Sequence, residues 1–303
     1  MICASYEVGW MFVRADRLLK GERPRWYSKH ALWYYWEGFR PCLDLYDLER
    51  GEVEELDLTA TLRRFDLSVS EERECVGSVE EGEYHPCSEH AALQGAFDQC
   101  RSCAGTWIPV QECIFEPRCA GDKCDSPLCR KKHVVYATFF GDLVKIGMTA
   151  GTRLRERAIE QGADAVARLA EFPNRLAARE AEKDISRRLR LPQRIRGEQV
   201  AEEMAKNPPA FSLKAKHERM KATLQDRYEL LKEEVVLLDQ YPGRELLMDI
   251  QNPRKVDAFG AHSGTMIGIK GRYLFYQDDE HDDWLMLPLA DLPSRHLEIG
   301  GHK

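Results

Sequence analysis

Seven of the ten cysteines fall between Cys87 and Cys129, and this clustering constrains the fold more than any other feature of the sequence. The stretch around them has few long apolar side chains, so it cannot build a hydrophobic core by itself. Segments of this kind are held together by a bound metal ion or by disulfides. Disulfides are disfavoured in the reducing cytoplasm, where we expect this chain because Glu7 precedes any long apolar stretch, unlike in a secretory signal. We therefore expect a metal.

The first group of candidate ligands consists of two pairs, each with two residues between its members. Cys87 and His90 form one pair, and Cys100 and Cys103 form the other. Two ligands at this spacing lie on one tight turn and face one ion, so two such pairs complete a tetrahedron around zinc. Four protein ligands leave no position for water, which predicts a structural zinc site rather than a catalytic one.

A second group of cysteines follows without any such pair. Its members are separated by gaps of 5, 4 and 4 residues, and His133 comes soon after the last one. We expect them to form a second structural zinc site, with His133 as a further candidate ligand. The group consists of Cys113, Cys119, Cys124 and Cys129.

Two alternatives to zinc remain open for these cysteines. They could be reduced residues buried in a core, or they could hold an iron–sulfur cluster. The other three cysteines have no ligand-like spacing, and we expect them to be ordinary small apolar residues. They are Cys3, Cys42 and Cys75.

The remainder of the 303-residue chain predicts a multidomain α+β protein. Its 43% of apolar residues exclude wholesale disorder, and no apolar run reaches the ~18 residues of a membrane span. Each β-rich end is small, so we expect the two ends to pair into one unit. The expected regions are a β-rich N-terminal region over 1–83, a cysteine-rich zinc-binding module over 84–132, a small β-hairpin and helix core over 133–207, a long helix over 208–240 and a C-terminal β region over 241–303.

Local patterns predict the main elements within these regions. Apolar alternation and β-forming residues indicate strands over 31–39, 42–48, 133–140, 143–146 and 264–276. Apolar residues three or four positions apart indicate helices over 153–161, 176–189 and 213–238.

Two features suggest ligand contacts but have simpler explanations. The aromatic residues of 33–36 could stack on nucleobases, yet such clusters usually form a β core, which we expect here. The acidic run over 278–283 could bind a divalent ion, but we expect a solvated hairpin loop.

Charge is distributed unevenly along the chain. The net charge is −7, but residues 130–196 carry 16 Lys or Arg against 8 Asp or Glu, which leaves −15 on the rest. A basic module inside an acidic protein indicates a polyanionic partner, here DNA or RNA, and an Arg-rich helix surface without a partner is the alternative.

One carboxylate stands out in the basic module. Glu182 falls on the apolar stripe of its expected helix, together with Ala178 and Ile185. A carboxylate aimed at the protein body needs a cation or a metal as partner. A salt bridge to Arg157 or Arg179 is the simpler interpretation, and a metal is the other.

The same module contains short motifs that carry a resemblance. Their order resembles the GIY-YIG nuclease domain and, more closely, an uncharacterised prokaryotic family of unknown function that joins a cysteine-rich region to a GIY-YIG-like core. The resemblance runs from about Cys87 to Tyr276. The matching stretches are 133–137, 145–149, Arg157 with 161–163, 173–175 leading to Glu182, and 268–274.

The nuclease resemblance implies roles for matching residues. Tyr136 would help to activate the attacking water, and Gly147 would allow a close backbone approach. Arg157 would neutralise the scissile phosphate, and Glu182 would hold a catalytic Mg²⁺ or Mn²⁺. Phosphodiester hydrolysis requires such a water, a charge clamp and a hard cation.

Two positions depart from the nuclease pattern. Lys145 replaces the tyrosine of the second motif, and lysine is a poor base unless its pKa falls. Gln161 stands where many active relatives carry histidine, and glutamine cannot shuttle a proton at neutral pH.

Three functions follow as hypotheses. The first is a metal-dependent nuclease acting on DNA or RNA through the basic 130–196 module. The second is a catalytically inactive, zinc-containing nucleic-acid-binding protein on the same scaffold. The third is an enzyme that uses the same pocket on a substrate other than nucleic acid.

Overall fold

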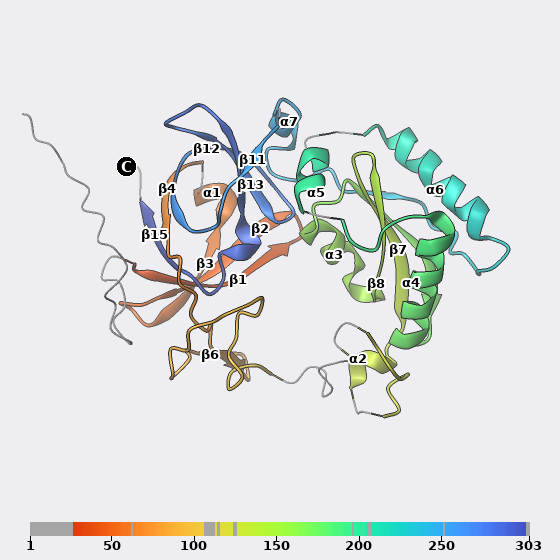
Figure 1. Ribbon diagram of the computed structural model, residues 1–303, viewed down its shortest axis with the longest axis horizontal. Helices are drawn as coiled ribbons and strands as arrows, with labels where there is room; N and C mark the ends of the chain where they lie inside the picture. Colours follow the sequence, from red (N-terminus) through yellow and green to blue (C-terminus); the bar gives the residue numbers. More distant parts are fainter. Residues whose placement is uncertain are drawn as a thin grey trace, which may run out of the picture.

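The computed structural model describes residues 27–61, 63–105, 113, 116–123, 126–195, 197–204, 206, 208–250 and 252–300. These residues form an α+β fold, as predicted. A nine-stranded sheet and a four-stranded sheet lie side by side in Figure 1. Within the described ranges, no helix is both long enough and apolar enough to cross a membrane.

The nine-stranded sheet combines strands from both ends of the chain, in the order β11-β14-β13-β12-β4-β15-β1-β2-β3. Strand β4 pairs with β12 on one side and β15 on the other, and β15 pairs with β1. The expected pairing of the two ends is therefore confirmed. The strands are β1 (Lys29–Glu37), β2 (Arg40–Asp47), β3 (Glu52–Asp57), β4 (Arg64–Val69), β11 (Arg254–Lys255), β12 (Gly260–Lys270), β13 (Tyr273–Asp278), β14 (Trp284–Pro288) and β15 (His296–Gly300).

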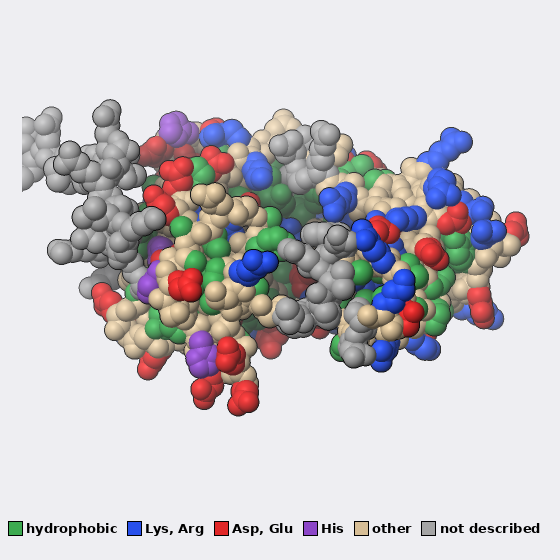
Figure 2. Space-filling view, turned by 60° about the horizontal axis from the view of Figure 1, so that its bottom comes forward, with side chains coloured by type: hydrophobic (Ala, Val, Ile, Leu, Met, Phe, Trp, Pro, Cys, Tyr) green, Lys and Arg blue, Asp and Glu red, His purple; other side chains and the backbone are tan. Residues whose placement is uncertain are grey.

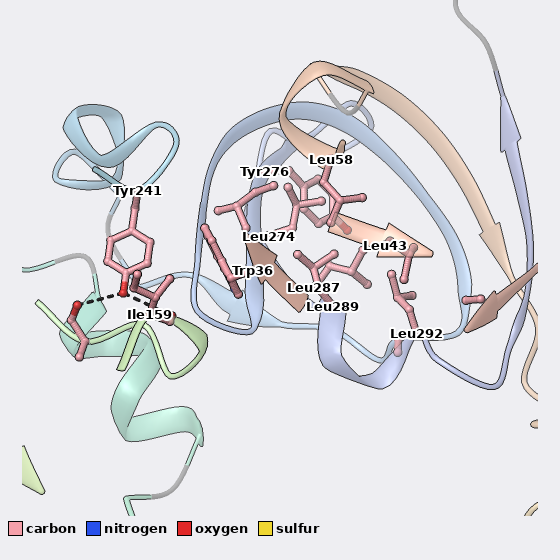
Figure 3. Packing of buried hydrophobic residues seen from close by; sticks show 14 of the residues in the cluster. Trp36, Leu43, Leu58, Ile159, Tyr241, Leu274, Tyr276, Leu287, Leu289 and Leu292 are labelled. Carbon is pink, nitrogen blue, oxygen red and sulfur yellow. Dashed lines mark hydrogen bonds between the residues drawn. The ribbon is translucent and has the colours of Figure 1, made fainter. Parts of the chain in front are cut away.

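The core of this sheet is apolar and well covered. Leu58 of α1 (Leu58–Thr61) packs with Leu43 and Tyr276, and all three are almost completely buried (Figure 3). Trp36 belongs to the same cluster, so this part of the 33–36 aromatic stretch lies in a β core as expected. In the acidic run over 278–283, Asp278 ends β13 and the other residues form the exposed turn before β14, also as expected.

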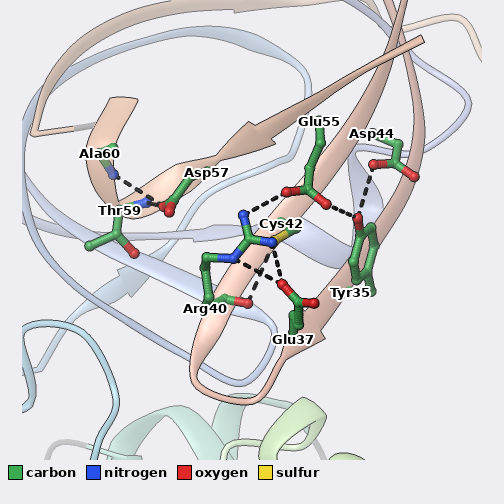
Figure 4. A network of polar contacts seen from close by, with 9 residues as sticks. All are labelled: Tyr35, Glu37, Arg40, Cys42, Asp44, Glu55, Asp57, Thr59 and Ala60. Carbon is green, nitrogen blue, oxygen red and sulfur yellow. Dashed lines mark hydrogen bonds and ion pairs between the residues drawn. The ribbon is translucent and has the colours of Figure 1, made fainter.

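The side chains of β1–β3 also form a polar network (Figure 4). Arg40 donates hydrogen bonds to Glu37 and Glu55, and the Tyr35 hydroxyl contacts Glu55 and Asp44. The side chains in these contacts include three carboxylates and one guanidinium group, so this surface repels a polyanion. This disfavours the alternative in which Tyr35 stacks on nucleobases.

The four-stranded sheet has the order β10-β9-β7-β8, and its central strand β7 is buried along its whole length. Because both faces of β7 are covered, its sequence is a continuous apolar run rather than an alternating one. The strands are β7 (His133–Phe140), β8 (Leu143–Ala150), β9 (Ala165–Phe172) and β10 (Val236–Leu237).

Helices cover this second sheet. Asn174 caps the start of α4 (Arg175–Leu189) by accepting a hydrogen bond from the Ala177 N–H at 2.9 Å, and the helix buries Ala178 and Ile185 against the sheet. Helix α6 (Ala210–Leu224) packs beside α4 (Figure 1). The other helices are α2 (Pro127–Arg130), α3 (Leu154–Glu160), α5 (Gly197–Met204) and α7 (Arg244–Leu247).

Two sequence expectations for this half are wrong. The helix expected over 213–238 ends at Leu224, and the segment after it runs along β9, where the Leu231 N–H bonds to the Leu169 carbonyl. The apolar residues after Leu224 have helical spacing, but here they lie in an extended segment, where Val235 and Leu238 are buried. Strand β9 was not expected, because its alanines are poor strand formers and hide the β pattern.

The two sheets are joined by buried polar contacts. Lys270 of β12 forms a buried salt bridge of 2.6 Å with Asp164, which precedes β9. The Tyr241 hydroxyl donates hydrogen bonds to the carbonyls of Ile159 and Ala163 at the end of α3 (Figure 3). The turn between β12 and β13 is thereby held beside the C-terminal end of α3.

The cysteine-rich region divides between the two halves. Its first part contains the hairpin of β5 (Ser78–Glu80) and β6 (Glu83–His85) and lies below the nine-stranded sheet in Figure 1. Its second part contains α2 and lies below the four-stranded sheet. The two groups of candidate zinc ligands therefore belong to different halves of the molecule.

Candidate functional site

Four cysteine thiols converge in the first part of the cysteine-rich region. The Sγ atoms of this cysteine cluster lie within 4.8 Å of one another, and those of Cys87 and Cys100 are 4.0 Å apart. Four sulfurs around a tetrahedral zinc ion at ~2.3 Å would be roughly 3.8 Å apart, whereas a disulfide joins two sulfurs at about 2.05 Å. The cluster therefore has the size of a metal site. Its members are Cys75, Cys87, Cys100 and Cys103.

Local backbone structure explains how Cys75 enters the cluster. Its sulfur accepts hydrogen bonds from the N–H groups of Gly77 at 3.4 Å and Cys100 at 3.1 Å. Gly77 has a φ of +78°, and a Cβ there would lie 2.2 Å from the His85 carbonyl oxygen. Only glycine fits this turn, which aims the Cys75 thiol at the other three.

Cys75 takes the place that we expected for His90. The expectation that Cys75 is an ordinary apolar residue is wrong, and His90 is not a member of the cluster. The His90 Nδ1 atom is instead hydrogen-bonded to Glu74 Oε1 at 2.7 Å. The overlooked signal was Gly77, two residues after Cys75, since a glycine at that position allows a tight turn at the sulfur.

The thiols affect one another electrostatically. Burial opposes ionisation of Cys100, but hydrogen bonds from the backbone and from neighbouring thiols outweigh it and lower its pKa to about 7. Burial and the adjacent thiols instead raise the pKa of Cys103. One thiolate thus disfavours a second, and a cation among the sulfurs would remove this repulsion.

The second cysteine group is only partly described. Cys113, Cys119 and Cys129 are buried, whereas Cys124 lies outside the described residues. In the described part of the chain, no three of these cysteines and His133 come together as the cysteine cluster does. The second zinc site therefore stays a prediction.

The other two cysteines without ligand-like spacing are Cys42 and Cys3. Cys42 is buried in β2, with its sulfur 3.7 Å from the Arg40 carbonyl oxygen, as expected for a core residue. Cys3 lies outside the described residues.

The predicted catalytic residues lie around the central strand of the four-stranded sheet. Tyr136 of β7 is paired across the sheet with Gly147 of β8. A Cβ at Gly147 would lie 2.7 Å from the Cζ atom of the Tyr136 ring. The glycine therefore makes room for the tyrosine ring, which is only 2% exposed.

The two departures from the nuclease pattern contact each other. The Lys145 Nζ atom donates a hydrogen bond of 2.5 Å to Gln161 Oε1, and the Gln161 Nε2 atom donates one of 3.4 Å to the Tyr136 hydroxyl. We call Lys145, Gln161 and Tyr136 the polar chain. It extends from a half-buried amine to a phenol whose pKa is raised by burial.

Lys145 is strongly perturbed. Its pKa is lowered to about 8, chiefly by burial and also by the positive charge of Arg157, while Glu182 opposes the change. Arg272 and Arg194 contribute to the lowering as well. A lysine with this pKa is partly neutral near pH 7 and can accept a proton.

Glu182 lies close to the polar chain but already has a partner. It is 6% exposed, and its Oε2 atom accepts a hydrogen bond of 2.6 Å from Arg179 Nη1. Burial raises the pKa of Glu182, and Arg179 opposes that rise. Of the two interpretations of Glu182, the structure contains the salt bridge to Arg179.

Arg157 has a different environment. Its guanidinium group is 45% exposed and pairs weakly with Glu160 at 3.3 Å. It is near enough to Tyr136 and Lys145 to favour the ionised phenol and the neutral amine. Arg157 is thus available to an anion that approaches from solvent.

Residues 63–283 match the family model for proteins of unknown function called DUF2797. The chain belongs to the DUF2797 family. The matched range contains the cysteine cluster and all residues of the polar chain, and it leaves β1–β3, β14 and β15 outside. No curated protein and no solved structure matches the chain. The resemblance to a family of unknown function is confirmed, and the resemblance to GIY-YIG nucleases stays a prediction.

Proposed function

We propose that this DUF2797 chain hydrolyses phosphodiester bonds in DNA or RNA, on a GIY-YIG-like core over 133–207. The polar chain carries the proposal. It joins an amine of lowered pKa to the buried Tyr136 hydroxyl, with Glu182 close enough to affect both. A perturbed lysine of this kind beside exposed arginines is typical of a reaction site.

Lys145 would act as the general base. A pKa of about 8 leaves roughly a tenth of the amine neutral at pH 7, which is sufficient for proton transfer from water. Gln161 orients the amine through its 2.5 Å hydrogen bond. Lys145 would therefore act as the base at the position where the nuclease pattern has the tyrosine of its second motif. Gln161 would not need to transfer a proton.

The phosphate would be held by Arg157. Its guanidinium group is an exposed cation beside the polar chain, and a guanidinium fork matches two phosphate oxygens. Charge that develops on those oxygens during hydrolysis would be stabilised there.

A hard cation fits this site only in part. Mg²⁺ or Mn²⁺ typically binds through one or two carboxylates, water and substrate phosphate, and Glu182 would be the protein ligand. Its Oε2 atom is held by Arg179, so the ion would have to compete with that guanidinium. When bound, the ion would neutralise charge on the phosphate.

A cleavage assay tests this proposal. Supercoiled plasmid and structured RNA would be incubated with wild-type protein in Mg²⁺, Mn²⁺ or EDTA, next to Glu182→Ala and Glu180→Ala. Glu180 is exposed on the same helix and serves as the matched control. We expect metal-dependent cutting that Glu182→Ala abolishes and Glu180→Ala keeps. Cutting by neither wild type nor control with either metal would refute the hydrolase.

The second candidate is a nucleic-acid-binding protein without catalysis. The salt bridge of Glu182 to Arg179 favours it, because a carboxylate neutralised by arginine needs no metal. Such a protein would bind nucleic acid equally well in Mg²⁺ and EDTA, and Glu182→Ala would leave its affinity unchanged.

We also propose that the cysteine cluster binds one structural zinc ion. Four thiolates form a closed donor set that suits zinc and leaves no place for water or substrate. Zinc would join the β5–β6 hairpin to the segment around Cys100 without taking part in hydrolysis. A second ion at Cys113, Cys119, Cys124 and Cys129 would be detected as a second equivalent of zinc.

A further inference from the structure

The turn between β12 and β13 is locked against the end of α3. Gly271 in this turn has a φ of +58°, and a Cβ there would lie 2.5 Å from the Gly162 nitrogen and 2.7 Å from the Gln161 carbonyl carbon. The Gly271 carbonyl accepts hydrogen bonds from the Tyr34 hydroxyl at 2.6 Å and Trp36 Nε1 at 2.9 Å. The nine-stranded sheet thus contacts the residue at the centre of the polar chain.

Arg272 follows directly in this turn. Its carbonyl oxygen accepts a hydrogen bond of 2.8 Å from the Leu289 N–H, which fixes its backbone. Its side chain is exposed. Its positive charge is near enough to favour the neutral amine of Lys145 and the ionised phenol of Tyr34. The nine-stranded sheet therefore contributes a cation beside the polar chain.

A second arginine comes from the four-stranded half. Arg194 lies in the loop after α4, where the Pro192 carbonyl accepts a hydrogen bond of 3.0 Å from the Ile146 N–H. In the same loop, Gln193 Oε1 accepts a hydrogen bond of 2.9 Å from Arg179. Arg194 is exposed too, and its charge reaches Lys145.

These two arginines lack neutralising partners in the described part of the chain. No acidic side chain there forms an ion pair with Arg194 or Arg272. Like charges gathered beside a half-buried lysine repel one another, unless an anion binds among them. Guanidinium groups are suited to phosphate, since each can donate two parallel hydrogen bonds.

We infer that Arg272 and Arg194 form, with Arg157, a phosphate subsite that flanks the polar chain, so that the nine-stranded sheet takes part in binding the nucleic-acid backbone. The inference rests on the proposed function for its ligand, a polynucleotide phosphate. It adds a residue from outside the basic 130–196 module, and it places the substrate across the junction of the two sheets.

The test is a salt titration of binding. Fluorescence anisotropy would follow a labelled single-stranded DNA in EDTA, with the full-length protein and its Arg272→Ala, Arg272→Lys and Arg254→Ala variants. Arg254 is an exposed arginine of β11 in the same sheet and serves as the control. Arg272→Ala should bind roughly tenfold more weakly, with a slope of log affinity against log salt that is smaller by about 0.7.

The controls separate this subsite from the proposed chemistry. Arg272→Lys should recover most of the salt slope, and Arg254→Ala should match the wild type. The subsite is overturned if Arg272→Ala keeps the wild-type affinity and slope, or if the wild type shows no salt-dependent binding. A protein that cuts DNA but shows no effect of Arg272→Ala would retain the hydrolase and lose the subsite. A protein that binds through Arg272 but never cuts would retain the subsite and lose the hydrolase.

Discussion

The cysteine cluster and the polar chain both gather side chains that are distant in sequence, but they differ in what those side chains already contact. The four thiols have the same chemistry, are spaced for one ion and repel one another when more than one is ionised. The polar chain mixes an amine, an amide and a phenol that are hydrogen-bonded to one another.

This difference shows what each site needs from outside. The cysteine cluster is a possible metal site, and its four-thiol donor set suits zinc. The polar chain satisfies its own hydrogen bonds, so its geometry alone does not name a ligand. Its function depends on the charges around it, which in Figure 2 gather as lysine and arginine over the four-stranded half.

The largest expected effect concerns the ion in the cysteine cluster. Cys75→Ser should remove the bound zinc and lower the free energy of unfolding by several kcal/mol, because structural zinc contributes directly to folding. His90→Ala should keep the zinc, since the cysteine cluster has four thiols without it. Zinc content by mass spectrometry and thermal unfolding with and without chelator would measure both. Zinc lost with His90→Ala and kept with Cys75→Ser would restore the ligand set expected from sequence.

The next effect concerns the base in the polar chain. Lysine accepts a proton only when neutral, so cleavage should rise with pH up to about 8 and then level off. Lys145→Met should slow cleavage by about 10²–10⁴-fold and abolish this rise. Lys132→Met, an exposed lysine 74% accessible at its side chain, is the control and should behave as wild type. An unchanged pH profile in Lys145→Met would assign the base elsewhere.

The smallest effect concerns packing beneath the polar chain. Gly147→Ala forces a methyl group to within 2.7 Å of the Tyr136 ring and should destabilise the protein by about 1–3 kcal/mol. Gly151→Ala, whose Cβ would meet no atom closer than 3.6 Å, should leave the melting temperature nearly unchanged. Equal melting temperatures for the two variants would show that the ring can move aside.

Much of the fold was predictable where a pattern depends on one element. The strand of β7 follows from its apolar run, and the inward position of Glu182 follows from helical periodicity. The pairing of the chain ends follows from their small size. Strand β9 was missed because alanine carries little β signal, and α6 was extended too far because Leu231 and Leu238 continue its spacing by chance.

The sites were predictable only where the ligands are close in sequence. The spacing of Cys87, Cys100 and Cys103 predicts them, but Cys75 lies twelve residues before Cys87 and enters through a turn that Gly77 permits. In the sequence, Lys145 and Gln161 each read only as the absence of a catalytic residue of the nuclease pattern. Their hydrogen bond depends on how α3 packs against β8, and no local pattern encodes that contact.

The order of strands in the nine-stranded sheet has a practical consequence. The range that matches the family begins at residue 63 and ends at residue 283, so a protein trimmed to that range would lose β1–β3, β14 and β15. Strand β4 would then lose its β15 neighbour and become an open edge of the sheet. Its apolar residues Phe65 and Leu67 would become exposed there. Unprotected edges of this kind recruit other chains. The trimmed protein should aggregate, although it would retain every residue of both candidate sites.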